Sequence, residues 1–132
     1  MRQQTPITRF FAAVAGIALG ASACATAPAP IQMDAAALHA YAAKPWNKAA
    51  LMNTTVELGR YRGVPVVAEH PCSDVCPQYT VRIIHYRLPP EATCASVGGV
   101  EKEVLVPIAI TVRSKTFCIP EPLVASGAYY AK

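Results

Sequence analysis

Four cysteines lie in the second half of this 132-residue chain, at positions 72, 76, 94 and 118. An even number of cysteines in a small exported domain predicts a framework of disulfide bonds. The same cysteines in a reducing compartment would be free thiols or metal ligands. The redox state of the compartment therefore decides whether these cysteines form disulfide bonds, and the N-terminus is the part of the sequence that indicates the compartment.

The N-terminus is typical of a secretory signal peptide. Residues 1–9 carry two arginines and no acidic residue, residues 10–20 are eleven uncharged and mostly apolar residues, and residues 21–23 are small. This order matches a signal peptide, and the apolar run is shorter than the ~18 residues that a membrane-spanning helix needs. We therefore predict that residues 1–23 are a signal peptide and that the chain is exported.

Cys24 follows the small residues directly, and Ala21-Ser22-Ala23-Cys24 resembles the lipobox of bacterial lipoproteins. The resemblance implies that Cys24 carries lipid, palmitate included, and binds the mature chain to a membrane. Ala25 comes next, which in similar Gram-negative lipoproteins implies the outer membrane, with the domain facing the periplasm. Ordinary signal cleavage after residue 23 and an uncleaved N-terminal anchor are the alternatives. Residues 24–33 predict a flexible tether, because they are rich in alanine and proline.

The composition excludes several functions. Hydrophobic residues make up 53% of the chain and charged residues 15%, which excludes a disordered charged tail. Without Arg2 and Arg9, 10 basic residues stand against 8 acidic ones, so the mature chain has a net charge of +2 and nucleic acid is not an expected partner. The sequence contains no nucleophile elbow, zinc-protease motif, phosphate loop or dinucleotide fingerprint. We therefore predict a non-enzymatic protein without a cofactor.

Residues 34–53 predict a short helical segment. Asp34 is suited to cap the helix that follows it, and Pro45 ends that helix. A second helical turn is expected over residues 46–52. Leu38 and Tyr41 give the first helix only a thin apolar face, so it depends on packing against the rest of the domain.

Residues 54–132 predict a small β-rich domain, with β-branched and aromatic residues in segments 54–61, 64–68, 79–86, 103–112 and 116–119. We expect an α+β fold: an antiparallel sheet of three to five strands, one N-terminal helix and disulfide staples. In segment 103–112, alternation predicts a buried face with Leu105 on the opposite side and a turn at residues 113–115. The predicted buried face is Val104, Val106, Ile108, Ile110 and Val112.

Proximity favours Cys72–Cys76 and Cys94–Cys118 among the three possible pairings. A turn at Ser73-Asp74 would bring the first pair within the ~4.4–6.8 Å between Cα atoms that a disulfide needs. The expected turn at residues 113–115 would return Cys118 toward Cys94.

Two other roles remain open for this region. The candidate metal ligands are His70, Cys72, Cys76 and His85, with Cys94 or Cys118 added, although their spacing differs from zinc-finger patterns. Cys72 and Cys76 are also a candidate redox pair, although catalytic dithiols usually have a two-residue spacer.

The segment from Cys72 to Ile83 reads CSDVCPQYTVRI. Its C-x3-C-P-x-Y pattern, followed by alternating apolar residues, resembles uncharacterised bacterial exported proteins and lipoproteins. The resemblance implies a secreted β-rich domain in which this motif opens a strand, and it implies no activity. In physical terms, Tyr79, Val81 and Ile83 are expected to begin one face of a sheet.

The remaining polar residues are given structural interpretations. The three histidines are expected to be structural or exposed, and Glu69 and Asp74 to be a solvated loop pair. Arg60, Arg62, Arg82 and Arg87 are expected on a solvated strand face, with a patch for anionic lipid or glycan as the functional alternative.

These patterns together predict a small cell-envelope lipoprotein. It would be a non-enzymatic binding or accessory module, held to the membrane by Cys24, whose partner is an envelope protein or glycan. The alternative is a periplasmic redox or metal-handling protein that uses His70, Cys72 and Cys76.

Overall fold

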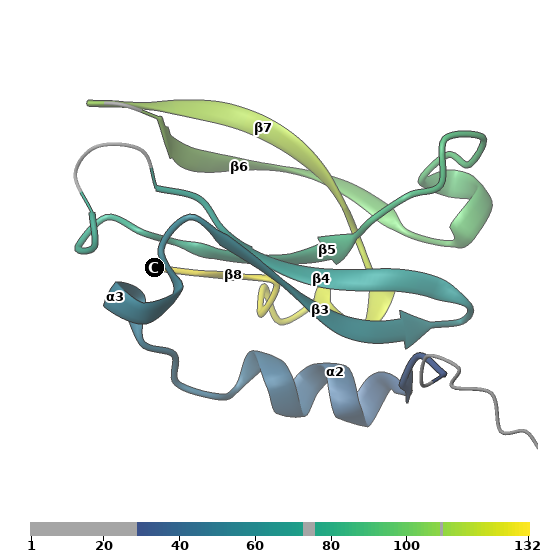
Figure 1. The fold of residues 1–132 in the computed structure, drawn as a ribbon. Helices are drawn as coiled ribbons and strands as arrows, with labels where there is room; N and C mark the ends of the chain where they lie inside the picture. Colours follow the sequence, from purple (N-terminus) through teal and green to yellow (C-terminus); the bar gives the residue numbers. More distant parts are fainter. Residues whose placement is uncertain (1–28, 73–75, 109) are drawn as a thin grey trace, which may run out of the picture.

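The computed structural model describes residues 29–72, 76–108 and 110–132, which form three layers (Figure 1). The main helix, α2 (Ala35–Ala42), covers one side of a curled sheet, and a hairpin of β6 (Val100–Ile108) and β7 (Thr111–Ile119) covers the other. The sheet has five strands in the order β2-β3-β4-β5-β8. These strands are β2 (Gln32–Met33), β3 (Thr54–Tyr61), β4 (Val64–His70), β5 (Arg82–Tyr86) and β8 (Tyr130–Ala131). The predicted α+β, strand-rich fold is confirmed.

Both predicted helical segments form, and each has a side-chain cap. The Asp34 carboxylate accepts a hydrogen bond from the Ala37 N–H at 2.8 Å, as the sequence predicts for α2. Asn47 caps the short helix α3 (Lys48–Leu51) in the same way. Leu38 is the one residue within α2 that is fully buried, so this helix does have a thin apolar face.

The central sheet is antiparallel except at one edge. Strands β3 and β4 are joined by Arg62-Gly63, which both have positive φ, the conformation of a tight two-residue hairpin turn. Strand β2 pairs in parallel with the end of β3, which makes the sheet mixed. The register of β3 with β4 shifts between Glu57 and Gly59. Glycine at position 59 permits the pairing with β2, because a Cβ atom there would collide with the carbonyl oxygen of Ile31. The predicted strand 79–86 is shorter than expected, since β5 begins at Arg82.

The β6–β7 hairpin differs from the prediction in register. Ile108 pairs with Thr111, so the chain reverses between these two residues, and the turn expected at residues 113–115 is wrong because these residues lie within β7. The expected continuous buried face is therefore wrong beyond Val106. The residues that are exposed instead are Ile108, Ile110 and Val112. The prediction failed because the apolar alternation runs on through a reversal of the chain and therefore does not mark one continuous strand. Leu105 is exposed, as predicted.

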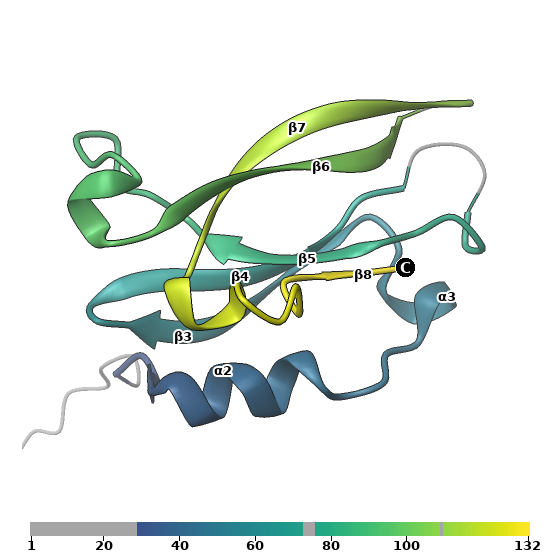
Figure 2. The ribbon, with the colours of Figure 1, turned by 180° about the vertical axis from the view of Figure 1, so that it is seen from behind.

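The hairpin packs against the sheet at one end only, and we name its two parts accordingly. The base of the hairpin contributes Val104, Val106, Phe117, Cys118 and Ile119 to the core. The tip of the hairpin, residues Ile108, Ile110 and Val112, extends beyond the core. After β7, the 3-10 helix η4 (Glu121–Leu123) lies against α2, and the chain returns to the sheet as β8 (Figure 2). None of the helices in the described part of the chain is long and apolar enough to span a membrane.

Candidate functional site

The four cysteines of the domain form the two predicted disulfide bonds. Cys72 bonds to Cys76 with 5.9 Å between Cα atoms, and Cys94 bonds to Cys118 with 5.5 Å. The second bond ties the segment before η3 (Ala95–Val97) to the base of the hairpin. Gly99 packs directly against it: a Cβ atom at this position would collide with the sulfur atom of Cys118 and would press tightly on the sulfur atom of Cys94 and the ring of Tyr86. Cys24 lies outside the described residues, so its predicted lipidation stays a prediction.

Arg82 corrects the expectation of a solvated strand face. Its side chain is only 2% exposed and points from β5 to the C-terminal end of α2. There Nη2 donates to the Ala42 carbonyl at 2.8 Å and Nη1 to the Lys44 carbonyl at 3.2 Å. The Ala42 carbonyl is one of those that a helix end leaves without partners, Lys44 follows just beyond the helix, and the negative end of the helix dipole favours a cation. Arg82 therefore caps α2 from the sheet, and its burial lowers the pKa of the guanidinium.

His70 is fully buried next to Arg82. Its Nδ1 lies 3.3 Å from the carbonyl oxygen of Thr54, and its ring centroid lies 5.1 Å from that of Trp46. Burial is the main cause that lowers the pKa of His70, and Arg82 lowers it further, against the opposing effects of the Thr54 carbonyl and Glu69. The ring is therefore neutral at pH 7, with Nδ1–H donating to Thr54. Among the described residues, no three His, Cys, Asp or Glu side chains are grouped as metal ligands.

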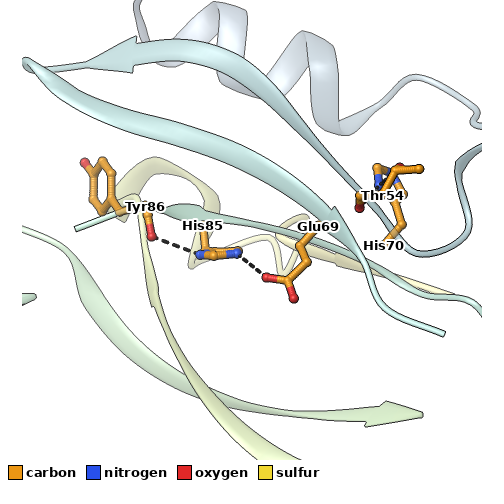
Figure 3. Close-up of polar contacts among 5 residues, drawn as sticks. All are labelled: Thr54, Glu69, His70, His85 and Tyr86. Carbon is orange, nitrogen blue, oxygen red and sulfur yellow. Dashed lines mark hydrogen bonds and ion pairs between the residues drawn. The ribbon is translucent and has the colours of Figure 1, made fainter. Parts of the chain in front are cut away.

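Glu69 and His85 form a pair on the other face of the sheet (Figure 3). The imidazole Nε2 lies 2.9 Å from Glu69 Oε1, and Nδ1 lies 2.9 Å from the Tyr86 carbonyl. This hydrogen bond, more than any other cause, lowers the pKa of Glu69, so its carboxylate is ionised at pH 7. Both ring nitrogens of His85 therefore lie within hydrogen-bond distance of an oxygen atom. The contact between Glu69 and His85 joins β4 to β5.

The other arginines lie at the end of the domain where the described chain begins. Arg60 and Arg87 line a hollow together with residues 29–31. Arg62 stacks over the Tyr61 ring at 5.2 Å, and Arg87 pairs with Glu57. A basic surface therefore exists here, partly neutralised by Glu57. Asp74, the expected partner of Glu69, lies outside the described residues.

The opposite end of the domain exposes large apolar side chains. Leu105 is 57% exposed, Ile110 87% and Val112 58%, and Tyr79 beside them is 60% exposed. Below the tip, a groove of about 360 Å³ separates the hairpin from the end of the sheet. Its lining residues come from five segments: Lys48, Gln78, Tyr79, Thr80, Val81, Leu105, Pro107, Val112, Tyr130 and Lys132. Contiguous apolar surface of this kind in a soluble domain typically marks an interaction site.

Comparisons with models of protein families, with curated proteins and with solved structures give no match. The candidate site therefore stands on its geometry alone. Sequence analysis missed it, because it assigned Ile108, Ile110 and Val112 to the core. A sequence signal did exist: Arg113 and Lys115 alternate with polar residues after Val112, which is typical of a strand with two solvated faces.

Proposed function

We propose that this protein is a non-enzymatic lipoprotein of the cell envelope that acts by binding. Cys24 anchors it to the outer membrane on the periplasmic side, and the hairpin tip is its contact surface. The observation that supports this most is the exposure of Ile108, Ile110 and Val112 on two strands whose other ends lie in the core. Exposed apolar side chains at the end of a strand pair are a liability for aggregation unless a partner covers them.

The two ends of the domain suit such a role. Strand β2, which follows the tether, lies at the opposite end of the molecule from the hairpin tip (Figures 1 and 2). Arg60, Arg62 and Arg87 are at the tether end, where anionic headgroups attract basic side chains. A domain tethered from this end would present its apolar tip away from the anchoring bilayer. The expected partner is therefore another envelope protein or a glycan.

The alternative function, redox or metal handling, has less support. It needs His70, Cys72 and Cys76 to be accessible, but His70 and Cys72 are buried and the two cysteines are bonded to each other. A count of free thiols and bound metal in protein taken from the envelope separates the two functions. Oxidised cysteines without bound metal support the binding module, and reactive thiols or stoichiometric metal support the alternative.

Membrane fractionation tests the anchor. The wild-type chain is expected in the membrane fraction, and the Cys24→Ser variant is expected either in the soluble fraction or unprocessed. A Cys24→Ser variant that is processed and still remains with membranes would contradict the anchor.

Crosslinking in the native host tests the contact surface. A photocrosslinking amino acid at position 110, in the hairpin tip, is expected to capture a specific envelope component. The same amino acid at position 91, which is exposed outside the tip, is the matched control. Equal capture from both positions, or none from position 110, would exclude the tip as the contact surface.

A further inference from the structure

The groove below the hairpin tip has the dimensions of a ligand site. Its volume of about 360 Å³ falls within the ~300–1,000 Å³ that is usual for ligand pockets. A second hollow shares Tyr79, Pro107 and Val112 with it and continues toward Ile110. The two hollows therefore adjoin, and a ligand that fills both reaches from Ile110 at the tip to Lys132.

The lining of the groove combines apolar walls with positive charge. Tyr79, Leu105 and Val112 provide large apolar surfaces. Lys48 and Lys132 also line it, and no side-chain carboxylate of the described residues does. Lys132 also lines an adjoining hollow, together with Glu103. Lys48 lines the groove but not that hollow, and no acidic side chain of the described residues lines the groove with it.

Thr80 also lines the groove, but it is fully buried, so its hydroxyl is not open to a ligand. The groove therefore offers apolar walls and two ammonium groups.

We infer that the groove binds an amphiphile that consists of one unbranched acyl chain and an anionic head. The acyl chain lies along Tyr79, Leu105 and Val112, and the head lies at Lys48 and Lys132. A carboxylate of a free fatty acid and a phosphate of a lysophospholipid share this chemistry. The inference concerns a ligand of the groove and holds whether or not Cys24 is lipidated.

Photolabelling of the full-length chain in isolated membranes tests this. The probe is dodecanoate that carries a diazirine in its chain, and the labelled peptides are identified by mass spectrometry. We expect labelling of the segments that contain Tyr79 and Leu105. Unlabelled dodecanoate and dodecyl lysophosphatidylglycerol should compete, and their relative potency distinguishes the two sources of the head. Dodecanol, which has the same chain and no charge, should compete about tenfold less well.

Variants separate the walls from the charges. Leu105→Asp should abolish labelling of the groove, and Ile31→Asp, an exposed apolar residue at the other end of the domain, should not affect it. Lys48→Gln with Lys132→Gln should remove the preference for dodecanoate over dodecanol, and Lys44→Gln, an exposed lysine outside the groove, should preserve it. Thermal melts confirm that each variant is folded.

Three results would overturn the inference: equal labelling of Leu105→Asp and wild type, equal competition by dodecanol and dodecanoate, or absence of label from the Tyr79 and Leu105 segments. None of them affects crosslinking from position 110. Failure of the ligand is therefore distinguishable from failure of the proposed contact surface.

Discussion

The base and the tip of the β6–β7 hairpin are built from the same two strands and have similar compositions, yet their surroundings are opposite. At the base, Val106 and Phe117 are buried and Cys118 is bonded to Cys94. At the tip, Ile110 and Val112 are exposed. The difference arises because the sheet and the disulfide cover only one end of the hairpin. Alternation of apolar residues thus describes a strand, but not whether anything covers its face.

The strongest test of this comparison replaces one apolar residue in each part by aspartate. Val106→Asp puts an unpaired carboxylate into the core and should cost at least about 3 kcal/mol, a large share of a stability of about 5–15 kcal/mol. Ile110→Asp should change stability by less than about 0.5 kcal/mol, because that side chain is already in solvent. Chemical denaturation measures both. Similar losses would mean that the tip is covered in the isolated protein.

The two disulfides extend the comparison. Loss of the bond between Cys94 and Cys118, which are 24 residues apart, should cost about 3.5 kcal/mol in the chain-entropy model. Loss of the bond between Cys72 and Cys76, which are 4 residues apart, should cost about 2 kcal/mol. Melting temperatures measure the two losses, and Cys94→Ser should lower the melting temperature more than Cys72→Ser does. The double variant Cys94→Ser/Cys118→Ser should be no less stable than either single one, and additive losses would show that these residues are not partners.

A smaller effect is expected from the buried arginine on the α2 side of the sheet. Arg82→Met removes the hydrogen bonds to the carbonyls of Ala42, the last residue of α2, and of Lys44 just beyond it, and should cost about 1–3 kcal/mol. Arg87→Met, next to the same strand but exposed, should cost less than about 0.5 kcal/mol. Hydrogen exchange in α2 measures the helix directly and should accelerate in Arg82→Met alone. Unchanged exchange would show that Arg82 does not hold the helix.

The smallest expected effect is a pH dependence. Because the pKa of His70 is lower in the folded protein than its ordinary value of 6.5, the unfolded chain binds the proton first as the pH falls. Stability is therefore full above pH 6.5 and declines as the pH drops below it, through the folded pKa. Denaturation between pH 7 and pH 5 should show this decline, and His70→Gln should reduce it. His39→Gln, at an exposed position on α2, should have the wild-type profile.

Local signals predicted much of the fold. The Asp34 cap and both disulfide pairings follow from side-chain chemistry within a few residues, or from chain reversal, and all are confirmed. Cys94 and Cys118 are brought together even though the expected turn is in the wrong place. The reversal between Ile108 and Thr111 aligns the same two strands over a longer register.

What was missed depends on contacts between distant segments. Arg82 has the spacing of a solvated strand residue, and nothing near it in sequence shows that Ala42 and Lys44 supply carbonyl partners. The groove likewise combines Lys48, Tyr79 and Leu105, which lie in three separate segments. Such sites form where the layers of the fold pack together. A periodic pattern within one segment does not show which distant segments will pack against it.

Gly99 carries a consequence for how this protein can diverge. Its backbone is pressed so closely against the Cys94–Cys118 bond and the Tyr86 ring that any side chain would displace a sulfur atom. A substitution at position 99 is therefore tolerated only after the two cysteines are lost, and their loss removes the reason for glycine. Among descendants of this sequence, the glycine and the cysteine pair should be gained and lost as a single character. An orthologue with both cysteines and a bulky residue at this position would need a different path for the segment between η3 and β6.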